Sequence, residues 1–169
     1  MNRFKKPLLF KNLTLSLRMR IIYEIAPNAK FIFVKRNPLY NAQSIIKARE
    51  KNTGLENWWS LEPPNKNELE KLSPEEQVIK QIYYVEKQIV NDAKQFPKEN
   101  LITLNYEDLC NDYKKELEKI KGFLGVTYMK GTNGSKINIS PTIKLSLEEK
   151  TIHKLKKEID ILDWKNYKD

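Results

Sequence analysis

The sequence predicts an α/β fold in which a small parallel sheet is flanked by helices. Two short apolar runs, Phe31 to Val34 and Leu101 to Leu104, have the aromatic and β-branched residues of strands buried on both faces. Segments with apolar residues at helical spacing lie between and around these runs. Strands that alternate with helices favour parallel pairing. Because only these two runs clearly predict strands, we expect the sheet to be small or incomplete.

Several segments combine this helical spacing with residues that are typical of helix ends. They cover residues 15–26, 39–49, 74–96, 113–124 and about 146–162. Asn37 and Pro38 provide a cap and a first-turn proline for the second helix. The residues from Ser73 to Glu76 form a capping box for the third helix, Gly125 ends the fourth, and the residues from Ser146 to Glu149 cap the last. The buried stripe of the third helix consists of Val78, Ile82, Val85, Ile89 and Phe96.

Composition indicates one globular domain over residues 1–169, because 40% of the residues are hydrophobic and 31% are charged. The sequence has no run of 18 apolar residues and no signal-peptide core, so we expect a cytoplasmic protein. The net charge of +9 favours anionic partners such as nucleotides, although solvated surface lysines are the simpler explanation. The basic residues are spread along the chain, so DNA is not an expected partner. One histidine, His153, and one cysteine, Cys110, do not make a zinc site, and no metal is expected.

A candidate phosphate site lies at the end of the first predicted strand. Arg36 follows that strand, and Ser44 comes eight positions later in the predicted second helix. In open α/β sheets, ligands bind beyond the carboxyl ends of the strands. A guanidinium and a hydroxyl group at that place could bind a phosphate, whereas the alternative is a surface arginine and an ordinary helix serine.

Two motifs resemble the family of PAPS-dependent sulfotransferases. The segment from Pro27 to Ser44, with its strand, Arg-Asn-Pro and serine, is similar to the family's 3′-phosphate-binding segment. The segment from Asn100 to Leu109, with Tyr-Glu-Asp-Leu after a strand, and the later Phe-Leu-Gly in 120–126 resemble a second family motif. The resemblance is strongest over residues 7–126, and residues 127–169 are expected to form a loop and a C-terminal helix. It implies a P-loop-NTPase-like sulfotransferase fold.

The resemblance also implies roles for four residues. Arg36 and Ser44 would bind the 3′-phosphate of PAPS or of adenosine 3′,5′-bisphosphate, which is the co-substrate of the family. Tyr106 would lie against the adenine, or it is an aromatic residue that covers the core. Lys11 would stand on a short strand and face the transferred sulfonate, where its charge would stabilise the leaving oxygen. The alternative for Lys11 is one more lysine in a basic terminus.

The sequence departs from the family pattern at its N-terminus. Sulfotransferases begin with a strand and a Gly-Ser/Thr loop that binds the 5′-phosphosulfate, and no glycine precedes Lys11 here. A catalytic base has no clear equivalent either. We therefore expect an N-terminally incomplete fold, weak nucleotide binding and little turnover by the chain alone. The alternatives are a truncated gene product, a gene start assigned too far downstream, and a half that a completing chain or a homo-oligomer completes.

The predicted function is transfer of a sulfonate group from PAPS to a hydroxyl or amine acceptor, which is a carbohydrate, an alcohol or a protein. The alternatives are a basic module that binds RNA or another polyanion, and an inactive truncated remnant. Other charged residues are weaker candidates for the site. One of Arg18 and Arg20 could face the bound anion. Glu107 and Asp108 are expected to interact with a helix dipole rather than to act as an acid/base pair. The pair Trp58 and Trp59 is expected to pack a loop, and the alternative is that it lines an acceptor pocket. Residues 131–136 lack the spacing of a phosphate loop.

Overall fold

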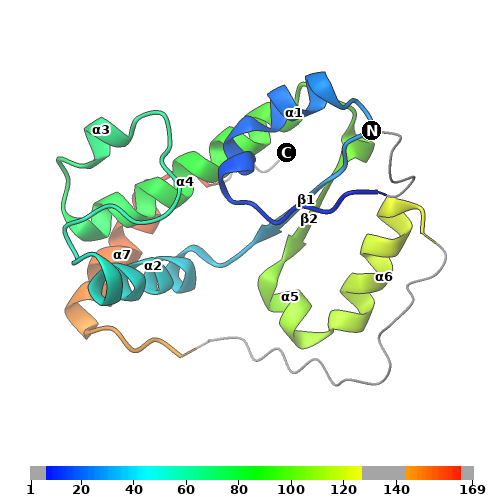
Figure 1. Ribbon diagram of the computed structural model, residues 1–169. Helices are drawn as coiled ribbons and strands as arrows, with labels where there is room; N and C mark the ends of the chain where they lie inside the picture. Colours follow the sequence, from blue (N-terminus) through cyan, green and yellow to red (C-terminus); the bar gives the residue numbers. More distant parts are fainter. Residues whose placement is uncertain (1–6, 127–143, 165–169) are drawn as a thin grey trace.

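The sheet has two parallel strands in the computed structural model, which describes residues 7–126 and 144–164 (Figure 1). Strand β1 (Phe31–Lys35) pairs with strand β2 (Leu101–Asn105). The register places Phe31 opposite Leu101 and Lys35 opposite Asn105. The mixed α/β class and the small parallel sheet are thus confirmed, while the P-loop-NTPase-like topology stays a prediction.

Helices surround the sheet, mostly where the spacing predicts them. They are the 3₁₀ helix η1 (Thr14–Arg18), α1 (Met19–Ile25), α2 (Pro38–Asn52), α3 (Lys66–Leu69), α4 (Pro74–Ala93), the 3₁₀ helix η2 (Lys98–Asn100), α5 (Tyr106–Asn111), α6 (Tyr113–Leu124) and α7 (Glu149–Ile161). The first expected helix is a 3₁₀ turn followed by an α-helix, and α4 ends three residues before Phe96. The short helices α3 and α5 were not predicted.

The predicted N-caps of α2 and α4 and the predicted glycine stop of α6 are confirmed. The side chain of Asn37 accepts a hydrogen bond from the Leu39 amide at 3.0 Å, and Ser73 and Glu76 form the capping box of α4. Gly125 ends α6 with a φ of 68°, a left-handed conformation that glycine adopts without a side-chain clash.

The expected cap of α7 by Ser146 is wrong. Glu148 stands at the cap position, and no side chain there caps the helix. The Ser146 amide instead donates a 2.7 Å hydrogen bond to the buried side-chain oxygen of Gln43 in α2. Ser146 therefore attaches the segment before α7 to the buried Gln43, and its side chain does not accept a hydrogen bond from the first amides of α7.

Two hydrophobic clusters share helix α4, which runs between them (Figure 1). The first cluster joins the start of α4 to α2 and α7, and it consists of Ala42, Ile46, Val78, Ile79, Ile82 and Leu155. The second joins the end of α4 to α1 and the sheet through Met19, Ile89 and Phe96, against which Phe31 and Phe33 pack. The predicted apolar stripe of α4 is thus the common wall of both clusters.

The expectation that both strands are buried on both faces is wrong. Val34 is 46% exposed, and in β2 only Leu104 is fully buried. The physical reason is that β1 pairs on one edge only within the described residues, and α1 and α4 cover the face that carries Phe31 and Phe33. No residue of β1 is therefore fully buried, and its face with Phe31 and Phe33 is better covered than the position of Val34.

Leu155 provides a direct test of the packing of α7. Its side chain has no exposed surface and lies in the cluster with α2 and α4. We expect Leu155→Ala to lower the free energy of unfolding by about 2–5 kcal/mol, because it leaves a cavity in that cluster. Urea denaturation measures the change. Ile161→Ala in the same helix is the matched control, because Ile161 is 63% exposed and its loss should change stability by less than about 0.5 kcal/mol. Equal effects of the two variants would contradict this packing.

Candidate functional site

The candidate site forms where the carboxyl ends of the two strands meet. Lys35 and Asn105 are the last residues of β1 and β2, and they lie opposite each other in the register. Arg36 follows the first strand and Tyr106 follows the second, so parallel pairing brings two residues 70 positions apart to the same edge. Asn37 and Pro38 then begin α2, and Tyr106 begins α5.

Arg36 and Ser44 are in direct contact. The Arg36 Nη1 donates to the Ser44 Oγ at 3.0 Å, and the Ser44 hydroxyl in turn donates to the Tyr40 carbonyl at 3.1 Å. The hydroxyl is thereby oriented with its proton along α2 and a lone pair toward the guanidinium. The spacing of eight residues predicted from the sequence therefore corresponds to one hydrogen-bonded pair.

Tyr106 supports the same guanidinium. The Arg36 Cζ lies 4.9 Å from the centre of the Tyr106 ring, which is a cation–π distance. A side-chain hydrogen bond with Cys110 raises the pKa of Tyr106, as does burial, while the charge of Arg36 lowers it. The phenol therefore stays neutral at physiological pH. The side chains of Arg36, Ser44 and Tyr106 form one cluster, which we call the strand-end cluster.

Glu107 makes a contact that sequence reasoning missed. Its Oε1 accepts a 3.1 Å hydrogen bond from the backbone amide of Asn37, so it joins the turn after β1 to the start of α5. The carboxylate of the neighbouring Asp108 accepts a 3.0 Å hydrogen bond from the Asn105 side chain within its own turn. No spacing rule links residues 37 and 107, because the contact depends on the register of the two strands.

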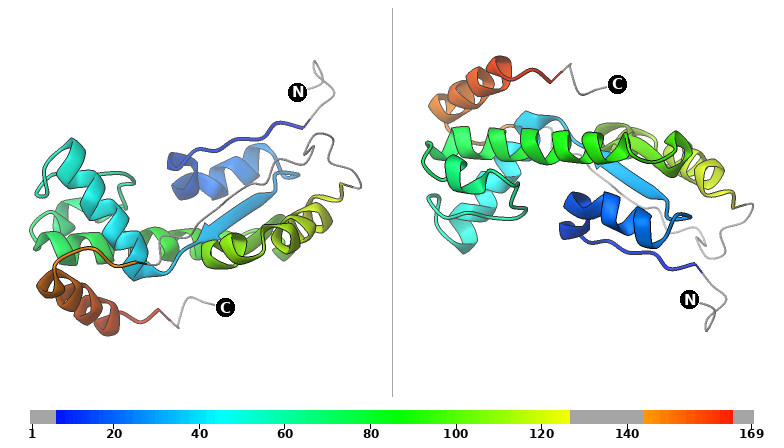
Figure 2. Two further views of the ribbon diagram at one scale, coloured as in Figure 1. Left: turned by 90° about the horizontal axis from the view of Figure 1, so that it is seen from below. Right: turned by 90° about the horizontal axis from the view of Figure 1, so that it is seen from above.

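Lys11 is not joined to the strand-end cluster by any contact in the described part of the chain. The expected short strand is absent: residues 7–12 form neither helix nor strand, and Lys11 is exposed. In Figure 2 this segment lies on the side of η1 and α1 that faces away from β1. The role of Lys11 opposite a sulfonate stays a prediction.

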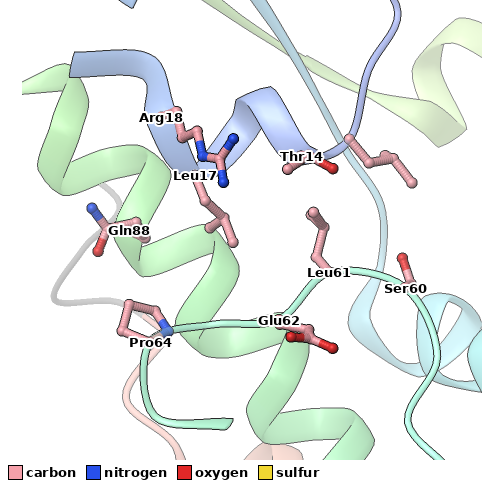
Figure 3. A pocket seen from close by; sticks show the side chains of 9 residues that line it. Thr14, Leu17, Arg18, Ser60, Leu61, Glu62, Pro64 and Gln88 are labelled. Atoms are coloured by element: carbon pink, nitrogen blue, oxygen red, sulfur yellow. The ribbon is translucent and has the colours of Figure 1, made fainter. Parts of the chain in front are cut away.

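The two candidate arginines of the first helix have different surroundings. Arg20 pairs with Glu24 at 3.6 Å, whereas Arg18 lines a cavity of about 640 Å³ between η1 and the loop around Leu61 (Figure 3). Trp58 does not line this cavity, and it packs with its Nε1 donating to the Leu61 carbonyl at 3.0 Å.

His153 is exposed on α7, as expected from its position between the motifs and the C-terminus. The described ranges contain no group of three or more His, Cys, Asp or Glu side chains that could hold a metal ion. The loop expected after residue 126, including the segment 131–136, lies outside the described residues. Within 7–126 and 144–164, no helix has the length and apolar character needed to cross a bilayer.

Comparison with known proteins gives one match. The family model described as "Sulfotransferase family" matches residues 2–130, which include both strands and every residue of the strand-end cluster. Neither the curated proteins nor the solved structures contain a match. Because the matched range covers more than half of the 169 residues, the chain belongs to the sulfotransferase family.

Proposed function

We propose that this protein transfers a sulfonate group from PAPS to a hydroxyl or amine acceptor and binds the 3′-phosphate of the donor at the strand-end cluster. Membership of the sulfotransferase family indicates sulfonate transfer in general. The contact of Arg36 with Ser44 and Tyr106 is the observation that supports a specific place for the donor.

The chemistry of a phosphate fits this cluster. A guanidinium carries several N–H donors in a fixed fork, which matches the oxygens of a phosphate. Ser44 and Tyr106 hold the Arg36 side chain in one orientation before any ligand binds. Such preorganisation increases affinity, because less side-chain entropy is lost on binding. Asn37 caps the start of α2, so the positive end of a helix of 15 residues lies close to Arg36 in the chain.

The transfer itself would be an in-line displacement. The acceptor oxygen or nitrogen forms a bond to sulfur, the bond between sulfur and the bridging oxygen of the 5′-phosphate breaks, and adenosine 3′,5′-bisphosphate leaves. The acceptor proton passes to a base or to water. In this scheme the strand-end cluster positions the donor, and Lys11 would stabilise the negative charge that develops on the bridging oxygen.

Isothermal titration with adenosine 3′,5′-bisphosphate tests the proposed donor site. We expect Arg36→Ala to weaken binding by about tenfold or more, because a charge-assisted hydrogen bond to phosphate is lost. Ser44→Ala should weaken binding by a smaller factor, since it removes only a neutral contact and the support of Arg36.

Arg20→Ala is the matched control, because Arg20 is an exposed arginine that pairs with Glu24 on another face. Equal affinities of the Arg36→Ala variant and the wild type would remove the proposal. Equal losses in the Arg36→Ala and Arg20→Ala variants, with a steep dependence on salt, would favour general polyanion binding.

Glu107 provides a second test that does not touch the phosphate. We expect Glu107→Ala to weaken nucleotide binding by a few fold, because the loss of one hydrogen bond to the Asn37 amide loosens the turn that carries Arg36. Asp108→Ala is the control, since Asp108 contacts Asn105 in its own turn and should leave affinity unchanged. The same titration measures both variants. Tighter binding to Glu107→Ala would instead show that the carboxylate acts by repelling the phosphate.

A further inference from the structure

A cavity of about 640 Å³ lies between η1, the loop 60–64 and helix α4 (Figure 3). Its size is typical of pockets that bind small molecules. Its polar side chains are Thr14, Arg18, Ser60, Glu62 and Gln88, and leucines and a proline supply the rest of the wall. This mixture suits a ligand with several hydroxyl groups and an apolar ring face.

One wall of this pocket is held by a buried glutamine. The Gln81 side chain is 2% exposed, and its amide nitrogen donates to the Trp59 carbonyl at 2.8 Å and to the Leu61 carbonyl at 2.7 Å. The carbonyls on both sides of Ser60 are therefore fixed by a single side chain of α4. The loop 60–64 is irregular in structure, yet its backbone is anchored to the core.

The orientation of Gln81 is set by a buried arginine. Arg49 has no exposed surface, and its Nη2 donates to the Gln81 Oε1 at 3.3 Å while its Nη1 donates to the Gln77 Oε1 at 2.9 Å. A guanidinium only donates, so the oxygen of the Gln81 amide must face Arg49 and its nitrogen must face the loop. Arg49, Gln77 and Gln81 thus form a polar clamp beneath the pocket wall.

Ser60, between the two clamped carbonyls, has a strained backbone. Its φ of 75° is in the left-handed region, and it is the one residue other than glycine with positive φ in the described ranges. Strain of this kind persists only where the surroundings enforce it, and it is concentrated at binding and active sites. The clamp and the backbone conformation together show that the pocket wall at Ser60 is held in one defined shape.

Arg18 supplies a positive charge on the opposite side of the pocket. Figure 3 shows Arg18 on η1 and Glu62 on the loop, with the opening between them. Glu62 pairs with Lys66 at 3.2 Å, and in the ranges 7–126 and 144–164 no carboxylate pairs with Arg18. The guanidinium is therefore available for an anionic group of a ligand.

The pocket is also close in the chain to the predicted sulfonate-facing lysine. Lys11 precedes Thr14, a pocket residue, by three positions, and the Asn12 side chain accepts a 2.9 Å hydrogen bond from the Thr14 amide. We propose that this pocket binds the sulfonate acceptor and that Arg18 selects acceptors with a carboxylate beside their hydroxyl groups, namely sugar acids. This inference rests on the proposed function for the role of acceptor, but binding in the pocket is tested without the donor.

Two disaccharides that differ in a carboxylate test the selection. Cellobiouronic acid and cellobiose are titrated separately into the full ¹⁵N-labelled chain, and amide shifts are followed by NMR. We expect the acid to shift the amides of η1 and of residues 59–62, and to bind about tenfold more tightly than cellobiose. Arg18→Ala should remove this difference, and Arg18→Glu should reverse it. Arg20→Ala, the matched control on the adjacent helix, should leave it unchanged.

Several results would overturn the inference. They are equal affinities of the two sugars for the wild type, shifts confined to other surfaces, absence of binding, and equal losses in the Arg18→Ala and Arg20→Ala variants. A parallel titration with adenosine 3′,5′-bisphosphate separates this inference from the donor site. If the chain binds the nucleotide but neither sugar, only the acceptor pocket is disproved. If the chain binds the sugar acid through Arg18 but does not bind the nucleotide, only the proposed donor site is disproved.

Discussion

The parallel register of β1 and β2 is the constraint on which the candidate donor site depends. It sets Lys35 against Asn105, and therefore Arg36 beside Tyr106, although the two residues are distant in sequence. Contacts at both ends maintain this register. Just before the two strands, the Asn100 side chain donates to the Ala29 carbonyl at 2.8 Å. Just after them, the Glu107 side chain accepts from the Asn37 amide. A shift of one residue would turn the side chains to the opposite face and separate the cluster.

The sequence predicts the elements that depend on local patterns. The proline and asparagine before α2, the capping box of α4 and the glycine after α6 act within a few residues, so their effect is visible without a fold. The pair of Arg36 and Ser44 belongs to the same class, because Arg36 stands two residues before α2 and Ser44 lies within the first two turns of that helix. The exposure of Val34 was not predicted, because burial depends on the strands and helices that surround a segment. A run of apolar residues in the sequence carries no information about these neighbours.

Polar residues with a structural role were the least predictable. Glutamine on a helix is usually a surface residue, yet Gln43, Gln77 and Gln81 are buried. Gln43 and Gln81 bind backbone groups of segments far along the chain, whereas Gln77 binds the Leu72 carbonyl in the turn just before its own helix. Ser146 has the pattern of a cap, but the buried oxygen of Gln43 competes for its amide. The pocket was missed for the same reason. Its wall at Ser60 depends on Arg49 and Gln81, which no motif connects.

Helix α4 fixes the two proposed sites relative to each other. Glu86 is buried and pairs at 2.6 Å with Lys35, the residue directly before Arg36, while Gln81 holds the pocket wall. Gln88, which lines the pocket, lies about two turns after Gln81 on the same helix face. Transfer between a donor and an acceptor requires their reacting atoms to be aligned to within about an ångström. A single 20-residue helix that contacts both sites can hold such an alignment, because it moves as one rigid element rather than as two loops.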